Sequence, residues 1–464
     1  MHVHFTMSNA ATSVGLLTAG GALAYVAGRR GWRPPLWAAL SVGLALRVLL
    51  LLLTHAIKPY DIYYDYHAAG LAVLHHQDPI LHARQSGWSF LPAYAFVLAG
   101  EIVFQHVVHT SWLYAGRSFA ILADLAVIAL VGVIAGRQNG ALRRFQYACY
   151  PLAVIDAAGR MDITCLALSL AALVLVLHQR APVSGRRALG AGALLGLAVG
   201  VNSWPLLFLP ALWRSLPSAR TRVQATAGVG AVVGGLFLTM PLTVGTPVRD
   251  LPGDARTILT YHGTIGTWGW SAAVVNIFRI HWYSPLGLAI GTVASLVALA
   301  AVLGAAWWWR RGHPLDLASA IICAFLVTTA SFGGQFLLWP APTLLARPPK
   351  RAWWYHTSVN VWSILALGIL AFPGHTRHIA NTALTEASLL VVPAIIGAMP
   401  WQRRSASRAA PAPRVPRPRV PRPGARAPVA GAPAVTASAE TRDRPRWRPG
   451  RASGSLRPCP GCRS

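Results

Sequence analysis

Long runs of apolar residues follow one another along this chain, and short stretches between them hold most of the charged residues. Many runs contain about 20 residues, the length of helix that crosses roughly 30 Å of hydrocarbon. The pattern predicts an all-α membrane protein, a polytopic helical bundle of about 11–13 spans or half-spans.

Basic clusters divide the runs and predict their direction. Six clusters hold 17 of the 41 Lys and Arg residues: 29–33, 137–144, 180–187, 214–222, 310–311 and 347–351. Because basic loops of membrane proteins lie mainly in the cytoplasm, each passage between two clusters must leave and return. The predicted passages are 36–56, 117–136, 145–158, 163–178, a hairpin or kinked excursion over 188–212 near Pro205, 224–245, 284–308, 315–332, 336–346, 353–372 and 382–399.

Residues 88–108 also have a helical pattern. The predicted passages keep every basic cluster in the cytoplasm only if this segment does not cross the membrane. It contains Pro92, Glu101 and Gln105, so we expect it to lie on or dip into the outer interface. A true span is the alternative.

The same boundaries predict the organisation of the chain. The first apolar run, Ala10 to Gly28, has its arginines after it rather than before it, which favours a retained span over a cleaved signal peptide. The predicted parts are 1–35, an extra N-terminal transmembrane helix and basic loop; 36–346, a membrane core with outer loops 57–116 and 246–283; 347–401, C-terminal transmembrane helices; and 402–464, a disordered Arg/Pro-rich tail.

Composition excludes a soluble protein and argues against a nucleic-acid partner. Of the 464 residues, 54% are hydrophobic and 12% charged, against about 25% charged in soluble proteins. The net charge of +28 comes from basic residues in the clusters and the tail, where membrane lipids are the expected partner. Cys149, Cys165 and Cys323 are expected to be buried thiols. Cys459 and Cys462 form a lone CxxC without the second pair that a structural zinc needs, so no metal site is predicted.

Acidic residues gather on one side of the predicted topology. Eight of the 13 fall on or near the outer face: Asp61, Asp65, Asp78, Glu101, Asp156, Asp162, Asp250 and Asp254. Carboxylates near the membrane are costly and mark candidate functional sites.

The first outer loop offers the strongest candidates. On a helix, Asp61 and Asp65 share a face and repel each other, which raises one pKa toward the range of a general base. Asp65 has the alternative reading of a solvated loop charge. The tyrosines at 60, 63, 64 and 66 fit an interfacial aromatic belt or stacking against a sugar.

Two further outer segments carry candidates. The turn AGRMD, residues 158–162, confines Arg160 and Asp162 beside the bilayer, where a lipid-linked phosphate would lie; an ordinary surface pair is the alternative. The stretch 246–283 contains Arg279 and His262, which either donate hydrogen bonds to a phosphate or belong to a loop that only anchors at the interface.

These segments resemble the polytopic glycosyltransferases of the C superfamily, most closely the family 87 polyprenyl-phosphate-mannose-dependent mannosyltransferases of actinobacteria. The resemblance covers about residues 36–346. It rests on Asp61 with the aromatic stretch, the Ala pair 68–69 and Asp-Pro at 78–79; on Gly159 to Asp162 before an apolar span; on GALLGLAVGVNSWPLLFLPALW; and on Gln335 to Pro340. The chain departs from the family pattern at Asn202, where a Lys is common, and at residues 90–92, where Phe-Leu-Pro replaces Tyr-Pro-Pro.

The resemblance implies an inverting hexosyltransferase that moves a sugar, mannose by analogy, from a polyprenyl phosphate donor to an envelope glycolipid or glycan acceptor on the outer face. In this role Asp61 deprotonates the acceptor hydroxyl, and Asp162 orients the acceptor or holds a divalent ion; metal dependence varies across the superfamily. Asp65, Arg160, His262, Arg279, Asn202 and Gln335 are the expected substrate-binding residues. No other cofactor is implied.

Two alternatives remain open. A secondary transporter or lipid flippase would use Arg47, Asp124 and Asp316 along a pathway, but Arg47 also fits a pair with Asp124 inside the helix bundle or a side chain that snorkels to the interface, and the sequence has no convincing internal repeat. A catalytically inactive scaffold is the other. Two lysines against 39 arginines, with abundant Ala and Pro, are typical of a high-GC bacterium. We therefore expect a multi-pass inner (plasma) membrane protein with its active site on the extracytoplasmic side.

Overall fold

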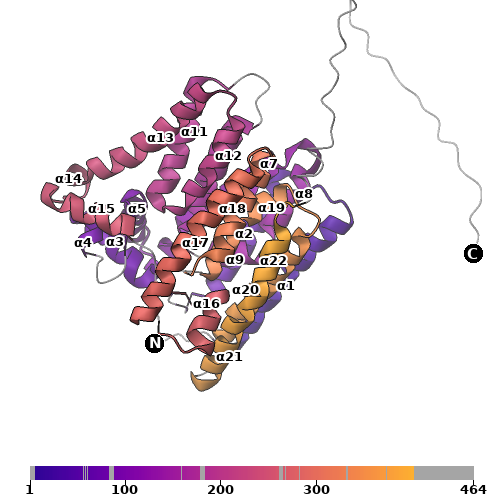
Figure 1. Ribbon diagram of the computed structural model, residues 1–464. Helices are drawn as coiled ribbons and strands as arrows, with labels where there is room; N and C mark the ends of the chain where they lie inside the picture. The colour runs from indigo at the N-terminus through magenta and orange to yellow at the C-terminus, as the bar shows by residue number, and fades with distance from the viewer. Residues whose placement is uncertain are drawn as a thin grey trace, which may run out of the picture. The chain divides into compact units, whose positions relative to one another are not determined.

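Every regular element among the described residues is helical, which confirms the predicted all-α class (Figure 1). The computed structural model describes residues 6–401 except 56, 58, 60, 83–87, 158, 178–182, 261–264, 267, 282, 331–332 and 373. These residues belong to one unit, Met1–Ala410. The predicted tail 402–464, with its CxxC, lies outside the described residues.

Six helical stretches in the described part are long and apolar enough to cross a bilayer. They are α1 (Met7–Arg29), α2 (Leu36–Leu53), the stretch Trp112–Ile134 formed by α6 (Trp112–Ala115) and α7 (Ser118–Ile134), α13 (Ala219–Leu238), α17 (Pro285–Trp309), and His375–Ala398 within α21 (Gly374–Ala387), η7 (Ser388–Leu390) and α22 (Val391–Ala398). The last stretch begins earlier than the predicted 382–399, because polar residues 374–381 are helical too.

Further helices pack against these stretches. They are α8 (Gly136–Ala148), α9 (Pro151–Asp156), α10 (Asp162–Leu177), α11 (Gly185–Val201), η3 (Trp204–Phe208), α12 (Leu209–Ser215), α18 (Pro314–Thr328), η6 (Gly334–Leu338), α19 (Ala341–Ala346) and α20 (Ala352–Ile369). The predicted excursion over 188–212 breaks between α11 and η3, next to Pro205. The predicted return over 336–346 is instead the two short helices η6 and α19, too short for one continuous span.

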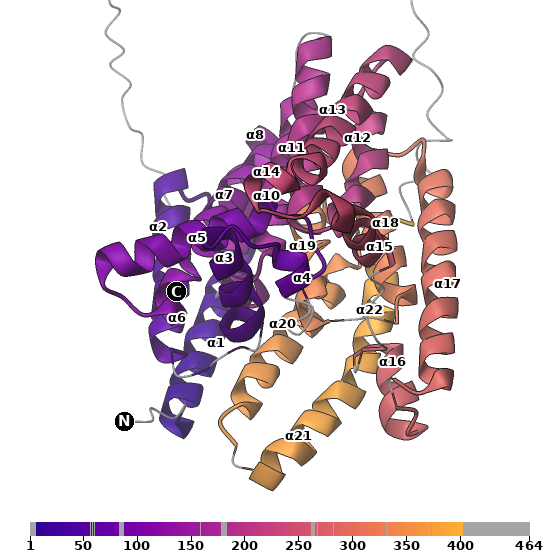
Figure 2. The same cartoon turned by 90° about the vertical axis from the view of Figure 1, so that its left-hand side faces the viewer.

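The predicted outer loops are also largely helical. The first contains the π-helix η1 (Asp61–Tyr66), α3 (His67–Leu74), α4 (Pro79–His82), α5 (Ala93–Val108) and α6. The short helix α14 (Met240–Thr243) precedes the second loop, which contains η4 (Val248–Asp250), α15 (Leu251–Thr260), α16 (Trp270–Ala272) and η5 (Ala273–Ile277). Figure 2 shows α5 running across the view at a steep angle to α17. That orientation favours a helix lying at the interface over a span.

Glu101 ties α5 to the start of α7. Its Oε1 accepts hydrogen bonds from the Phe119 backbone N–H at 2.9 Å and the Ser118 hydroxyl at 3.3 Å. The first N–H groups of a helix have no partner within the helix, and a carboxylate there is favoured by the helix dipole. Glu101 therefore has a structural role.

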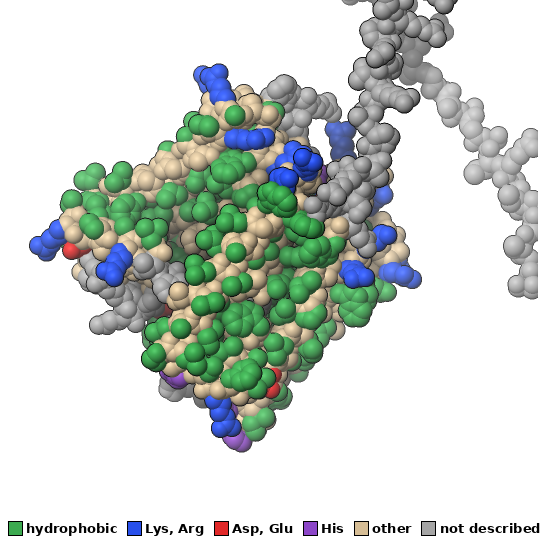
Figure 3. All heavy atoms as spheres, viewed as in Figure 1, with side chains coloured by type: hydrophobic (Ala, Val, Ile, Leu, Met, Phe, Trp, Pro, Cys, Tyr) green, Lys and Arg blue, Asp and Glu red, His purple; other side chains and the backbone are tan. Residues whose placement is uncertain are grey.

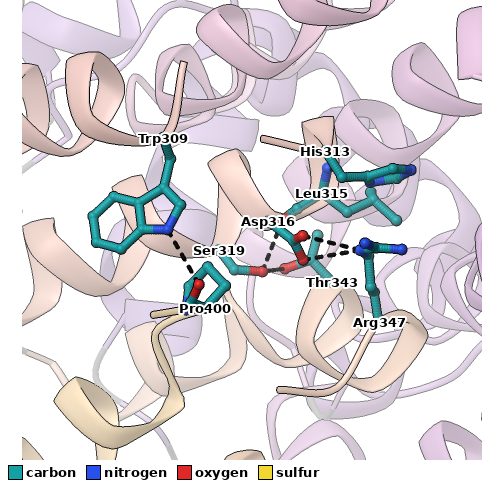
Figure 4. A network of polar contacts seen from close by, with 8 residues as sticks. All are labelled: Trp309, His313, Leu315, Asp316, Ser319, Thr343, Arg347 and Pro400. Atoms are coloured by element: carbon teal, nitrogen blue, oxygen red, sulfur yellow. Dashed lines mark hydrogen bonds and ion pairs between the residues drawn. The ribbon is translucent and has the colours of Figure 1, made fainter. Parts of the chain in front are cut away.

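Charges inside the bundle are paired. Arg47 on α2 forms a buried ion pair with Asp124 on α7, and Asp124 also accepts a hydrogen bond from the Tyr147 hydroxyl at 2.8 Å. Arg347, directly after α19, binds both oxygens of Asp316 on α18 at 3.0 Å (Figure 4). The Arg47–Asp124 pair matches the non-transporter interpretation of those two charges. Cys149, Cys165 and Cys323 are buried free thiols, as predicted.

Close backbone contact joins α11 to α13. A Cβ atom added to Gly192 would lie 1.9 Å from the Ala225 carbonyl oxygen, and one added to Gly228 would lie 2.4 Å from that of Leu189. Small residues allow such approach between helices in a membrane.

The surface agrees with a lipid environment. In Figure 3 hydrophobic side chains cover most of the visible face, and Lys and Arg side chains lie near its margins. Helix α17, at one side of the bundle in Figure 2, exposes Val293, Leu296 and Leu303 by about 60% or more.

Candidate active site

One cavity of about 640 Å³ brings together six of the eight residues that sequence reasoning selected. They come from the first outer loop, the 156–162 turn, the end of α11 and η6: Asp61, Asp65, Arg160, Asp162, Asn202 and Gln335. Segments up to 274 residues apart in sequence therefore contribute polar groups to one space.

The π-helix η1 supplies Asp61 and Asp65, which both line the cavity. Single π-helical turns are frequent at functional sites. Two contacts fix the position of η1. The indole N–H of Trp112 donates to the Ile62 carbonyl oxygen at 2.8 Å, and the Ile62 side chain is buried.

The tyrosines of this loop are expected either to form an interfacial aromatic belt or to stack against a sugar, and they differ in position. Tyr66 is buried, lines the cavity and makes edge contacts with Trp88 and Tyr94, with ring centroids 6.1 and 5.8 Å away. Tyr63 and Tyr64 are exposed, as in an interfacial belt. Tyr60 lies outside the described residues.

Gly159 lets the turn between α9 and α10 lie against η1. Its φ of +125° is unfavourable for other residues, and an added Cβ would lie 2.4 Å from Ile62 Cδ1 and 3.0 Å from Arg117 Cγ. The backbone N–H groups of Gly159 and Arg160 donate to the Asp156 carbonyl oxygen at 3.2 and 3.1 Å. These contacts fix the backbone position of Arg160, from which its side chain extends.

From this turn, the Arg160 side chain forms an ion pair with Asp61 of η1. Both side chains are partly exposed, by 29% and 37%. Burial lowers the pKa of Arg160, and the neighbouring Asp162 carboxylate opposes that shift, so the guanidinium keeps its charge near two acids.

Asp65 is the unpaired carboxylate of the group. Its Oδ1 is buried and has no hydrogen-bond partner among the described residues. Burial raises the pKa of Asp65 to about 6, because the charged form loses hydration.

Asp162, the first residue of α10, is buried and accepts a hydrogen bond from the indole N–H of Trp339 at 3.1 Å. Asn202 lies in extended backbone where α11 ends, and Gln335 lies in η6. Both amides line the cavity and offer donors and acceptors.

The rest of the cavity is mainly apolar. Its walls come from η3, α17 and α18: Leu206, Leu207, Ala298, Leu299, Val302 and Phe325. The interacting charges of Asp61, Arg160 and Asp162, which we call the polar end, and the apolar wall along α17, which we call the trough, therefore line one cavity, which suits an amphipathic ligand.

Among the described residues, Arg279 is a predicted site residue that does not line this cavity. Arg279 is exposed in the segment after η5, with a φ of +55°. His262 lies outside the described residues. Sequence reasoning also missed Ser203 and Ser295 as cavity residues; the signal for Ser295 is a polar side chain in the otherwise apolar run of α17.

The described residues offer no set of metal ligands. No three His, Cys, Asp or Glu side chains in this part of the chain come together as a group that could hold an ion. Asp61 is bound by Arg160. These residues do not fit a metal, and we derive no step through one.

Comparison with protein-family models finds a match for this chain. The family model of glycosyltransferase family 87 matches residues 92–332, which is 241 of the 464 residues. The matched range contains Arg160, Asp162 and Asn202 and begins after Asp61 and Asp65. A search of the curated proteins finds no match.

Proposed function

The chain belongs to glycosyltransferase family 87 and is a multi-pass membrane glycosyltransferase, and from this premise we propose its donor, its acceptor and its chemistry. The donor is a polyprenyl phosphate sugar, with mannose as the sugar. The acceptor is a hydroxyl of an envelope glycolipid or glycan at the outer face of the plasma membrane.

The observation that carries the proposal is the two-part cavity. A polyprenyl phosphate sugar has a charged, hydroxylated head and a long apolar chain. The polar end with Asp61, Arg160 and Asp162 suits the head, and the trough along Ala298, Leu299 and Val302 of α17 suits the first isoprene units. A nucleotide sugar has no part that would use an apolar trough.

The chemistry is a single displacement with inversion at the anomeric carbon. Asp61 accepts the proton of the acceptor hydroxyl, whose oxygen forms the new bond to C1. The bond between C1 and the phosphate oxygen breaks, and polyprenyl phosphate leaves with the electron pair. Arg160 stabilises the charge that develops on the phosphate.

Arg160 and Asp61 must separate for this reaction, because Arg160 binds Oδ2 of Asp61. The donor phosphate is a second anion that competes for the guanidinium, because the planar guanidinium group matches the oxygen geometry of both phosphate and carboxylate. Donor binding then leaves Asp61 free to accept a proton.

The donor class is tested with purified protein in liposomes. One reaction contains radiolabelled polyprenyl phosphate mannose with an envelope glycolipid extract, and the other contains the labelled nucleotide sugar. We expect label to enter the glycolipid only from the lipid-linked donor. Transfer from the nucleotide sugar alone would overturn the proposal.

A further inference from the structure

Asp162 is held by a tryptophan from a distant part of the chain. Trp339 follows η6, 177 residues after Asp162, and its indole N–H donates to Asp162 Oδ1 at 3.1 Å. Both side chains are buried to within a few per cent and both line the cavity. The contact therefore connects α10 with the η6 segment at the polar end of the site.

Aromatic neighbours fix the orientation of the Trp339 ring. Trp204 stacks on it almost in parallel, with ring centroids 4.0 Å apart and an interplanar angle of 6°. Phe336 lies 4.3 Å away at 33°. Stacked aromatic rings resist rotation in a packed interior, so the N–H of Trp339 has a defined direction.

A buried carboxylate needs such a donor to keep one orientation. The χ2 torsion of aspartate is broad, with no sharply preferred angle. A hydrogen bond to an ionised carboxylate is stronger than one between neutral groups. The neighbouring Arg160 guanidinium interacts with the same carboxylate and would otherwise influence its orientation.

We propose that Trp339 is a positioning residue for sugar transfer, whose indole N–H sets the angle at which Asp162 meets a sugar hydroxyl. The inference rests on the proposed function. It assigns Trp339 no contact with the reacting atoms; the side chain acts through Asp162, and Trp204 acts by holding the Trp339 ring.

The test is Trp339→Phe, which keeps an aromatic ring for stacking and removes the N–H. We expect kcat for transfer from polyprenyl phosphate mannose to fall about tenfold, with KM for the donor within about twofold of wild type. Trp309→Phe is the matched control, because Trp309 is also buried and donates its indole N–H to the Pro400 carbonyl oxygen at 3.4 Å, away from the cavity (Figure 4). Its kcat should equal that of wild type.

A double variant separates positioning from packing. If Trp339 acts through Asp162, adding Trp339→Phe to Asp162→Ala, which leaves no acceptor for the indole N–H, should change kcat less than twofold. A tenfold loss in that background as well, or a Trp339→Phe enzyme as active as wild type, would overturn the inference.

Binding gives a readout that needs no residual activity. Radiolabelled farnesyl phosphate should bind Trp339→Phe within twofold of wild type, and weakening beyond fivefold would show that Trp339 shapes the lipid pocket instead. Failure of the proposed function has a different signature, which is the absence of transfer by wild type itself.

Discussion

Arg160 pairs with Asp61 across 99 residues of sequence, and the pair lies at the polar end of the cavity. The π-helix of the first outer loop presents the carboxylate, and the turn before α10 presents the guanidinium. In a site for a phosphate-bearing donor, binding of the phosphate must break this ion pair.

Asp61→Asn should bind prenyl phosphate more tightly than wild type. The substitution removes the anion that occupies Arg160, so the guanidinium becomes available to phosphate. We expect the Kd of farnesyl phosphate to fall about fivefold, which corresponds to roughly 1 kcal/mol, in equilibrium binding to detergent-purified protein.

Asp65→Asn is the control for this measurement. It removes a second carboxylate from the same cavity, one that makes no ion pair with Arg160. A fall in Kd of equal size in both variants would mean that general repulsion, rather than competition for Arg160, sets the affinity.

Gly159→Ala should lower the transfer rate at least tenfold. The new methyl group would press against Ile62 and Arg117 and move the turn that carries Arg160 away from η1. Gly136→Ala introduces comparable backbone strain, since its φ is +77°, but its added Cβ has nothing within 4 Å. Initial rates at equal folded protein should therefore fall in the first variant alone; equal losses in both would indicate a general folding defect.

The KM for the sugar acceptor should rise as pH falls through about 6. Burial raises the pKa of Asp65 to about 6, so this carboxyl takes up its proton about two pH units above the pKa of a free aspartate and becomes a weaker hydrogen-bond acceptor for hydroxyls. Above that pH it is ionised and the KM should be constant. In Asp65→Asn, the KM measured from pH 5 to 8 should no longer rise at low pH. An unchanged rise would assign this pH dependence to another group.

Membrane sidedness has its own test. Tyr64 is 55% exposed in η1, and Arg311 is exposed beyond α17. In a background with Cys459→Ser and Cys462→Ser, an impermeant thiol reagent on intact cells should label Tyr64→Cys and leave Arg311→Cys unlabelled until the membrane is permeabilised. The reverse pattern would place the cavity in the cytoplasm.

Much of the fold can be predicted from the sequence because uniform apolar runs have one helical outcome in a bilayer. The predicted passages 36–56 and 284–308 correspond to α2 at Leu36–Leu53 and α17 at Pro285–Trp309. Errors arise where polar residues continue a helix, as at 374–381, or where a segment such as 336–346 folds as short pieces.

The site could be predicted only in part. Topology places Asp61 and Arg160 at the same surface, but their pairing depends on Gly159 lying against Ile62, which no local pattern reveals. The stacking of Trp204 on Trp339 joins residues 135 positions apart, and apolar context makes each look like an ordinary membrane tryptophan. Arg279 fitted the chemistry of phosphate binding yet lies outside the cavity lining.

The most direct measurement is transfer of labelled mannose from polyprenyl phosphate mannose by Asp61→Asn in liposomes. Because Asp61 is the proposed base, the rate should fall at least about 100-fold while farnesyl phosphate still binds. Asp250→Asn, which removes an aspartate paired with the exposed Arg249 outside the cavity lining, should transfer at the wild-type rate. An Asp61→Asn protein that transfers mannose as fast as wild type would contradict the account.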